Sequence, residues 1–317
     1  MPELSVCIAI CSRRRPILLK RALTTLSKLA IPDGVSLKFL LVENDDKVQY
    51  EPLVEEMASR LDLTYVVEPV AGLSYARNKV IDTATEMGVD WLGCVDDDQI
   101  IDPGWLKHMI KAVRAYPETA MFVGKWVRTN PAATPSWYPA LGYRKKHKTG
   151  AKLSDGVGGN AFIRADVFSP DGMALRYDHE YRFLGGEDTD FSLQYRKKGG
   201  IIRNVREAVT TEEIPAERNG LSGRMARIVW MQAVLAKLRH RYHSPPVALL
   251  LSLQIVYQGV VLGIAYMLVG FLALPFNEHW GLKRYGVGRR YWARVHGVLR
   301  YYFGGPLEEP YRTTLGN

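Results

Sequence analysis

The chain has 317 residues, of which 47% are hydrophobic and 24% are charged. This composition is that of a globular protein rather than a disordered chain, and the length allows one large domain or one domain with an appendage. We expect no N-terminal secretory signal, because Ser12 and the arginines after it end the first apolar run. Cys7, Cys11 and Cys94 follow no disulfide or metal-site spacing, which predicts reduced core cysteines in a cytosolic compartment.

The net charge of +9 is concentrated in the C-terminal third. The segment from Arg218 to Arg300 holds twelve Lys or Arg residues and one acid, Glu278. The rest of the chain is close to neutral. A basic segment attached to a near-neutral one indicates an anionic partner, either nucleic acid or a membrane surface.

Apolar runs and amphipathic segments alternate through the first two thirds of the chain. The expected strands are Leu4–Cys11, Ser36–Val42, Leu63–Val67, the run that begins at Trp91, Ala120–Val127 and Ile201–Val209. The expected helices are Pro16–Lys28, Pro52–Leu61, Tyr75–Glu86, Gly104–Tyr116 and one that ends near Lys198. Strands alternating with helices predict an α/β fold with a Rossmann-like, mostly parallel sheet, helices on both faces and right-handed crossovers.

Two of the expected strands end in carboxylates. The strand from Trp91 ends in Asp96-Asp97-Asp98, and the strand from Ser36 ends in Glu43-Asn44-Asp45-Asp46. Ligands of parallel sheets bind beyond the carboxyl ends of the strands, so both acidic ends should line one crevice. A hard cation such as Mg²⁺ or Mn²⁺ would balance three adjacent carboxylates. The alternative for the triple Asp alone is a solvated acidic turn.

Three later segments carry further candidate residues. Asn130–Tyr143, which includes Trp137, is expected to be a long loop over the site. Gly158 and Gly159 precede Asn160 and would let the backbone approach a ligand closely. Gly185-Gly186-Glu187-Asp188 then opens a helix.

Together these segments resemble the inverting, GT-A-type glycosyltransferases of family 2 over roughly Leu4–Ile214. Among them, the pattern is most similar to bacterial exopolysaccharide glucosyltransferases of the succinoglycan type, which build a repeat unit on a polyprenyl diphosphate carrier. The resemblance implies a GT-A catalytic domain at residues 1–215. It rests on Ser12-Arg13, Val42-Glu43-Asn44-Asp45, Gly72-Leu73-Ser74-Tyr75-Ala76-Arg77-Asn78, Asp96-Asp97-Asp98, Gly158-Gly159-Asn160-Ala161 and Gly186-Glu187-Asp188-Thr189-Asp190-Phe191.

The resemblance also implies roles on the side of the sugar donor. Asp98 would hold Mg²⁺ or Mn²⁺ and thereby stabilise charge that grows on the leaving diphosphate, with Asp96 near the ribose and Asp97 beside it. Either Glu43 or Asp45 would accept a hydrogen bond from the nucleobase. The nucleotide contacts would come from two arginines, for which surface or inter-element ion pairs are the alternative: Arg13 and Arg77.

On the acceptor side, the resemblance makes Asp188 the general base and Glu187 the residue that holds the acceptor. Acidic residues in a first helical turn are also favourable on dipole grounds alone, so the motif by itself leaves a capping role open. Gly159 and Trp137 are expected near the acceptor, and Asn160 near donor or acceptor hydroxyls.

Residues 216–317 are expected to form a helical membrane-association region. Leu221–His243 reads as a basic amphipathic helix, and Val247–Phe276 carries no charge. Because basic residues flank this run on both sides, we favour a re-entrant or interfacial hairpin that bends near Gly259 and Gly263. One membrane span, or helices buried in protein or in a homo-oligomer, are the alternatives. Arg289–Arg300 suits a second interfacial helix, and nucleic acid is not expected as a partner.

The expected activity is transfer of a hexose, glucose by resemblance, from a UDP-linked donor to a polyprenyl-diphosphate-linked saccharide. The expected location is the cytoplasmic face of the plasma membrane, as a peripheral or monotopic protein. A polyprenyl-phosphate monosaccharide synthase is the alternative with related chemistry. A sugar nucleotidyltransferase and a catalytically silent membrane-docking module are alternatives of other classes.

Overall fold

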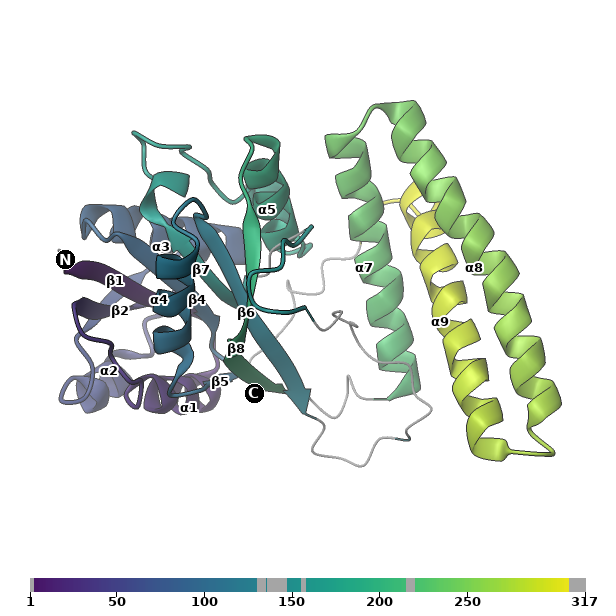
Figure 1. Cartoon of the computed structure of the whole chain (residues 1–317), viewed down its shortest axis with the longest axis horizontal. Helices are drawn as coiled ribbons and strands as arrows, with labels where there is room; N and C mark the ends of the chain where they lie inside the picture. Colours follow the sequence, from purple (N-terminus) through teal and green to yellow (C-terminus); the bar gives the residue numbers. More distant parts are fainter. Residues whose placement is uncertain (1–2, 130–134, 136–146, 155–157, 215–219, 308–317) are drawn as a thin grey trace. The chain divides into compact units, whose positions relative to one another are not determined.

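The computed structural model describes residues 3–129, 135, 147–154, 158–214 and 220–307 (Figure 1). The described residues divide into two compact units. Residues 3–129, 147–154 and 158–213 belong to the first unit, and 135, 214 and 220–307 belong to the second. The described strands all lie in the first unit, and the second is helical.

The first unit is built on one eight-stranded sheet with the strand order β3-β2-β1-β4-β7-β6-β8-β5. Four of the seven described pairings are parallel, which agrees with the predicted mostly parallel sheet. The two strands absent from the prediction, β5 and β7, both pair antiparallel. The strands are β1 (Leu4–Ser12), β2 (Val35–Glu43), β3 (Leu63–Val67), β4 (Trp91–Asp96), β5 (Gln99–Ile101), β6 (Met121–Thr129), β7 (Asn160–Arg164) and β8 (Ile202–Glu213).

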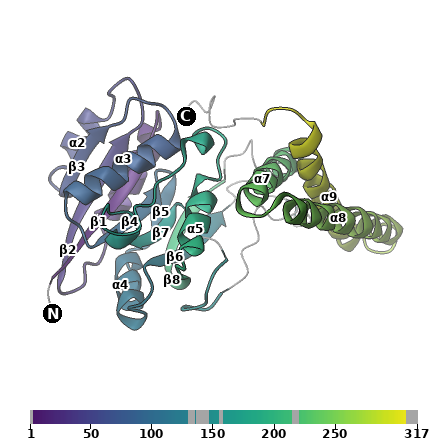
Figure 2. The same cartoon turned by 90° about the horizontal axis from the view of Figure 1, so that it is seen from above.

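Helices cover both faces of this sheet, as predicted (Figures 1 and 2). Successive residues of a strand point to opposite faces. Ile8 and Ile10 accordingly pack with α1, α2 and α4, whereas Cys7 and Ala9 pack with α3 and α5. The helices are α1 (Pro16–Leu26), α2 (Glu51–Met57), α3 (Leu73–Glu86), α4 (Trp105–Ala115) and α5 (Glu187–Lys197), with short 3₁₀ turns η1 (Ala165–Val167) and η2 (His179–Tyr181).

The register of the parallel strands brings their polar ends together. Ser12 at the end of β1 lies opposite Glu43 of β2, and Cys11 lies opposite Asp96 of β4. The carboxyl ends of these three strands therefore share one edge of the sheet, as their sequence patterns predict.

The second unit contains three long helices, α7 (Leu221–Tyr242), α8 (Pro245–Ala273) and α9 (Glu278–Phe303) (Figure 1). The bend predicted near Gly259 and Gly263 is wrong, because α8 is continuous through both residues. These glycines lie instead where α9 comes close, since a Cβ on Gly259 would overlap Val295 and one on Gly263 would lie 3.1 Å from Trp292. The chain reverses only after α8 ends.

Candidate active site

Arg77 on α3 joins carboxylates from two distant parts of the chain. One guanidinium nitrogen lies 3.1 Å from Oε1 of Glu187 at the start of α5, and the other lies 3.6 Å from Oδ1 of Asp96 at the end of β4. The guanidinium carbon is also 5.4 Å from the centre of the Tyr177 ring. The Arg77 side chain is 11% exposed, so these interactions are largely shielded from water.

The start of α3 is held by side chains and backbone from elsewhere. Asn44, just after β2, donates to the carbonyls of Glu68 (3.0 Å) and Val70 (2.7 Å) and accepts from the backbone N–H of Gly72 (2.8 Å). Gly72 has a φ of 137°, and a Cβ there would lie 2.7 Å from the Cβ of Arg182. The turn before α3 therefore needs glycine, and it fixes the position from which Arg77 projects.

Asp188 lies beside the glycines that precede β7. Its Oδ2 accepts from the backbone N–H of Gly158 (3.0 Å) and its Oδ1 accepts from the N–H of Thr189 (2.7 Å). A Cβ on the next glycine, Gly159, would overlap Oδ2 of Asp96. The structure thus places the carboxylate at the start of α5 and the carboxylate at the end of β4 on either side of two consecutive glycines.

Burial raises the pKa of three carboxyl groups in this region, those of Asp96, Asp97 and Glu187. Burial raises the pKa of Glu187 to about 7, with the Asp188 charge acting in the same direction and Arg77 opposing it. Burial likewise raises the pKa of Asp97 to about 6, against the effect of Arg15 and with that of Asp98. Carboxyl groups with strongly raised pKa values are typical of functional sites.

Side chains at the end of β1 and just after it contact Asp97. It accepts from Oγ of Ser12 (2.7 Å), and Arg15 lies 3.2 Å from its Oδ1 and 3.7 Å from Oδ2 of Asp98. Arg13 was one of the two arginines predicted to contact the nucleotide, and that remains a prediction. Arg15 is the arginine of this run that lies beside the acidic turn. Nε of Arg13 is buried and has no hydrogen-bond partner among the described residues.

The Asp96–Asp98 turn suits a divalent cation whose remaining ligands are supplied by the substrate. The described residues contain no group of three His, Cys, Asp or Glu side chains that could hold a metal ion alone. Mg²⁺ in enzymes of phosphate chemistry is often bound by one or two carboxylates plus substrate phosphates. The side chains of Asp96 and Asp98 are 39% and 25% exposed, so both can offer oxygen ligands to such an ion.

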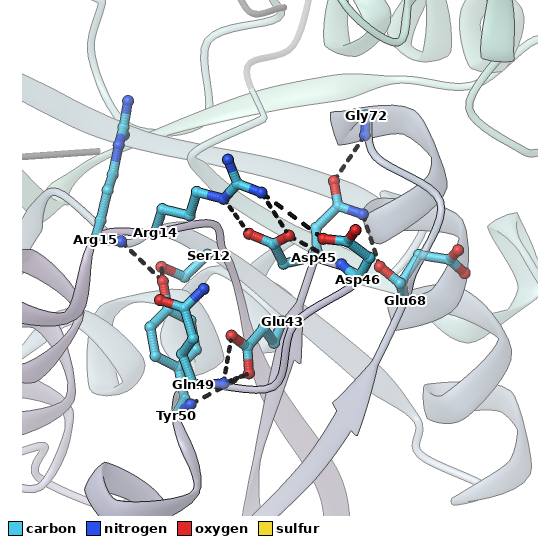
Figure 3. A network of polar contacts seen from close by, with 11 residues as sticks. Ser12, Arg14, Arg15, Glu43, Asp45, Asp46, Gln49, Tyr50, Glu68 and Gly72 are labelled. Atoms are coloured by element: carbon cyan, nitrogen blue, oxygen red, sulfur yellow. Dashed lines mark hydrogen bonds and ion pairs between the residues drawn. The ribbon is translucent and has the colours of Figure 1, made fainter. Parts of the chain in front are cut away.

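The two carboxylates predicted at the nucleobase form contacts of their own after β2 (Figure 3). Glu43 is buried and accepts from the backbone N–H groups of Gln49 (3.0 Å) and Tyr50 (3.3 Å) and from the Tyr65 hydroxyl. Asp45 is paired with Arg14, one of whose nitrogens donates to its Oδ1 at 2.9 Å. Both groups thus order the loop after β2, and neither contacts Arg77 or the Asp96–Asp98 turn in the hydrogen bonds and ion pairs described.

Asn160 lies in the core. Its Oδ1 accepts from the Trp105 indole (2.8 Å), and its Nδ2 is within 3.3 Å of the Thr210 hydroxyl and the Ala208 carbonyl. Its hydrogen-bonding capacity is used in joining β7 to α4 and β8. Trp137, which was predicted near the acceptor, lies outside the described residues.

Two residues beside the site were not predicted. Tyr177 stacks under Arg77, and Gln99 accepts from the backbone N–H of Asp96 (3.4 Å). Gln99 is fully buried, and its Nε2 has no hydrogen-bond partner among the described residues. Its position directly after the triple Asp was the available signal, whereas no local pattern marks Tyr177.

The mixed α/β sheet with acidic strand ends and helices on both faces agrees with the GT-A fold of glycosyltransferases. The chain belongs to glycosyl transferase family 2, because the model of that family matches residues 5–170. This confirms the resemblance found in the sequence. The chain is therefore a glycosyltransferase.

One curated relative is the succinoglycan biosynthesis protein ExoM of Rhizobium meliloti (strain 1021). It is 29% identical over 223 residues, which cover 69% of this chain and 70% of the relative. The relationship agrees with the resemblance of the motifs to those of succinoglycan-type glycosyltransferases.

Solved structures share the fold at low sequence identity. Residues 1–349 of S. aureus TarS, in complex with UDP-GlcNAc, match with a TM-score of 0.55 and 14% identity over 95% of this chain and 92% of that one. The mannosyltransferase PcManGT of Pyrobaculum calidifontis, in complex with GDP-Man and Mn²⁺, matches with a TM-score of 0.59 and 13% identity over 95% and 88%. These likenesses establish the fold.

Proposed function

We propose that the protein transfers glucose from a UDP-linked donor, with inversion, to a hydroxyl of a polyprenyl-diphosphate-linked saccharide at the cytoplasmic face of the plasma membrane. The observation that carries the proposal is the meeting of Asp96, Glu187 and Asp188 around Arg77 and two glycines. The relationship to ExoM supports exopolysaccharide synthesis. The nucleotide sugars bound to TarS and PcManGT support a donor of that class.

The donor would lie at the Asp96–Asp98 turn. Mg²⁺ or Mn²⁺ held by Asp98 would act as a Lewis acid toward the leaving diphosphate, and the Mn²⁺ in PcManGT supports this choice of ion. Asp97 and Arg15 fix the conformation of the turn through their 3.2 Å contact. Asp96 would face the ribose, with Arg77 balancing its charge.

The acceptor would lie at the start of α5. Asp188 would take the proton of the attacking hydroxyl, while the N–H groups of Gly158 and Thr189 hold its carboxylate in one orientation. Glu187, beside it, would hold the acceptor sugar. A single displacement by the deprotonated hydroxyl inverts the anomeric centre and requires no covalent enzyme intermediate.

The base is tested by Asp188→Asn. We expect kcat for transfer to a saccharide hydroxyl to fall by about 10²–10⁴-fold, because the amide cannot accept the proton. Binding of UDP should change little, and an Asp171→Asn variant on an exposed loop should retain wild-type kcat. Unchanged transfer in Asp188→Asn would remove Asp188 from the mechanism.

The same variant separates a second candidate function, a polyprenyl-phosphate monosaccharide synthase. The exposed apolar side chains of α8 favour a lipid substrate in either case. A lipid phosphate is already ionised and needs no base, so Asp188→Asn would retain transfer to polyprenyl phosphate. Transfer to that lipid by the wild type, undiminished in the variant, would replace the first proposal with the second.

Donor and metal are tested by thermal unfolding with a panel of nucleotides and nucleotide sugars. We expect UDP and UDP-glucose to raise Tm in the presence of Mn²⁺ or Mg²⁺, because a ligand that binds only the folded state stabilises it. Asp98→Asn should lose the metal-dependent part of this shift, and Asp171→Asn should keep it. If none of the nucleotides raises Tm, the donor site is contradicted. If only a non-uridine nucleotide raises Tm, the UDP assignment is contradicted.

A further inference from the structure

Helix α8 leaves large apolar side chains exposed along its whole length. It has 29 residues and no charged side chain, and among the described residues it is the one helix long and apolar enough to cross a membrane. Contiguous exposed apolar surface of this kind marks a surface for another apolar phase. The exposed large side chains are Val247, Leu249, Leu250, Leu253, Tyr257, Val261, Leu262, Ile264, Leu268, Val269, Phe271 and Leu272.

Helix α9 packs antiparallel against α8 through glycines. A Cβ on Gly270 would lie 2.6 Å from the backbone nitrogen of Tyr285, and one on Gly288 would lie 2.8 Å from the carbonyl oxygen of Gly263. Near the middle of α8, a Cβ on Gly259 would lie 3.1 Å from the carbonyl oxygen of Tyr291. The two helices therefore stay in close contact from the C-terminal end of α8 to its midpoint.

Basic side chains lie along this contact. Arg289 and Arg290 follow Gly288, and Arg294 follows Tyr291 by less than one turn. If α8 crossed a bilayer, α9 would enter with it, and these three arginines would lie near the centre of the hydrocarbon. Arginine at that depth is strongly unfavourable. The pairing of the helices thus opposes a span, although α8 alone has the length and composition for one.

We propose that α8 and α9 lie flat in one leaflet of an anionic membrane, and that neither helix crosses it. This rests on the membrane association in the proposed function and specifies its geometry. The exposed apolar side chains of α8 enter the region of the acyl chains, and the Lys and Arg residues of α9 bind lipid phosphates. Trp280 and Trp292, which are 40% and 39% exposed, suit the boundary between the two regions.

The geometry is tested by labelling the two ends of α8 from one side of a membrane. Ser244→Cys and Glu278→Cys are made separately in the full chain, and each protein is added to preformed vesicles of phosphatidylglycerol mixed with phosphatidylcholine. A membrane-impermeant maleimide should label both variants to the same extent before and after detergent. Wild type gives the background of Cys7, Cys11 and Cys94. Protection of one end until detergent is added would show a span and overturn the proposal.

The chemistry of the surface is tested by flotation with the same vesicles. Because each basic residue near an anionic surface contributes to binding, Arg289→Gln with Arg290→Gln should weaken binding about tenfold. Leu268→Ser with Phe271→Ser should weaken binding further at every lipid composition. Ile17→Ser on α1, which removes an exposed apolar side chain of the first unit, should change nothing.

Three outcomes of flotation contradict the proposal. Equal binding to pure phosphatidylcholine would remove the role of the arginines, and unchanged binding of the Leu268→Ser, Phe271→Ser variant would remove the role of α8. No binding of the wild type would end the membrane association itself. Sugar transfer to a soluble saccharide acceptor, measured in parallel, reports separately on the catalytic part of the proposed function.

Discussion

The carboxylates of this site have different contacts, although they occur in similar sequence patterns. Glu43 and Asp96 both end buried parallel strands, yet Glu43 is closed in by Tyr65 and the backbone of residues 49–50, whereas Asp96 faces Arg77. That difference depends on Tyr65 and Arg77, which lie 22 and 19 positions away along the chain. The sequence therefore predicts that acidic groups gather at this edge, but not which of them stay available to a substrate.

The same limit applies to the arginines near the start of the chain. Three consecutive arginines follow Ser12, and only the conformation of that turn directs Arg14 to Asp45 and Arg15 to Asp97. Arg77, Glu187 and Asp188 were predicted because their motifs resemble those of a known family. The structure adds that Arg77 contacts Glu187 directly.

Glu187 should give the stability of the protein a distinctive dependence on pH. Burial raises its pKa from 4.5 to about 7, so between these values the folded state binds a proton that the unfolded state has released. The free energy of unfolding should therefore fall as pH rises through this window, by an amount on the order of 1–3 kcal/mol.

Urea unfolding at several pH values between about 4.5 and 7 measures the effect. Glu187→Gln cannot titrate and should lose this part of the slope. The free energy of unfolding of the wild type should therefore fall relative to that of the variant as pH rises. The exposed variant Asp171→Asn should follow the wild type. Parallel curves for Glu187→Gln and wild type would contradict the raised pKa.

At the scale of elements, periodicity predicted most of the first unit and missed the strands that depend on tertiary pairing. The strands β1, β2, β3 and β4 are apolar runs of ordinary length, whereas β5 has three residues and is defined by its pairing with β8. β7 begins at Asn160 among glycines and carries no alternating pattern. β5 is an edge strand and β7 is an interior strand, and both are defined by pairing with strands that are distant in the sequence rather than by a local pattern.

Glycine in α8 has two local meanings that the sequence cannot separate. It permits a bend, as expected for Gly259 and Gly263, and it permits a close approach of another backbone. The second meaning applies here, because each of these glycines faces a residue of α9. Only the partner helix distinguishes the two cases.

Gly270→Ala should destabilise the pair formed by α8 and α9. The added Cβ would lie 2.6 Å from the nitrogen of Tyr285 and 2.7 Å from the carbonyl oxygen of Gly281, and both are backbone atoms that cannot turn away. Overpacking of this kind costs about 1–3 kcal/mol, which exceeds the gain in helix propensity from alanine.

Thermal unfolding followed by circular dichroism measures this change. Gly270→Ala should lower the Tm of the helical transition, whereas Leu268→Ala, which shortens a side chain that is 58% exposed on the same helix, should leave it in place. A higher Tm for Gly270→Ala would mean that α9 does not pack closely against α8.

At the scale of the whole molecule, composition predicted that catalysis and membrane association belong to different parts of the chain. The two compact units are compatible with that prediction. The first unit contains every described contact of the Arg77 site. The second contains the exposed apolar helix α8, and its helices α7 and α9 carry eleven of the twelve Lys and Arg residues counted from Arg218 to Arg300. Each unit has its own buried residues. This arrangement suggests that nucleotide binding and membrane binding can be separated.

A chain that ends after Ile214 should bind nucleotides and lose membrane binding. The site residues and both faces of the sheet remain, while α7, α8 and α9 are removed. The shift of Tm with UDP and metal should persist, and flotation with anionic vesicles should disappear. Continued flotation of the shortened chain would assign membrane binding to the first unit.

Arg77 supplies one positive charge to two acidic groups that we assign to different substrates. A sugar nucleotide bound beside Asp96 would interact with the same guanidinium that lies 3.1 Å from Glu187. Binding of one substrate thus changes the electrostatic potential at the site of the other substrate, and no backbone movement is needed. We expect this electrostatic coupling to be reciprocal, so that a bound sugar nucleotide changes the affinity for the acceptor by the same factor as a bound acceptor changes the affinity for the sugar nucleotide.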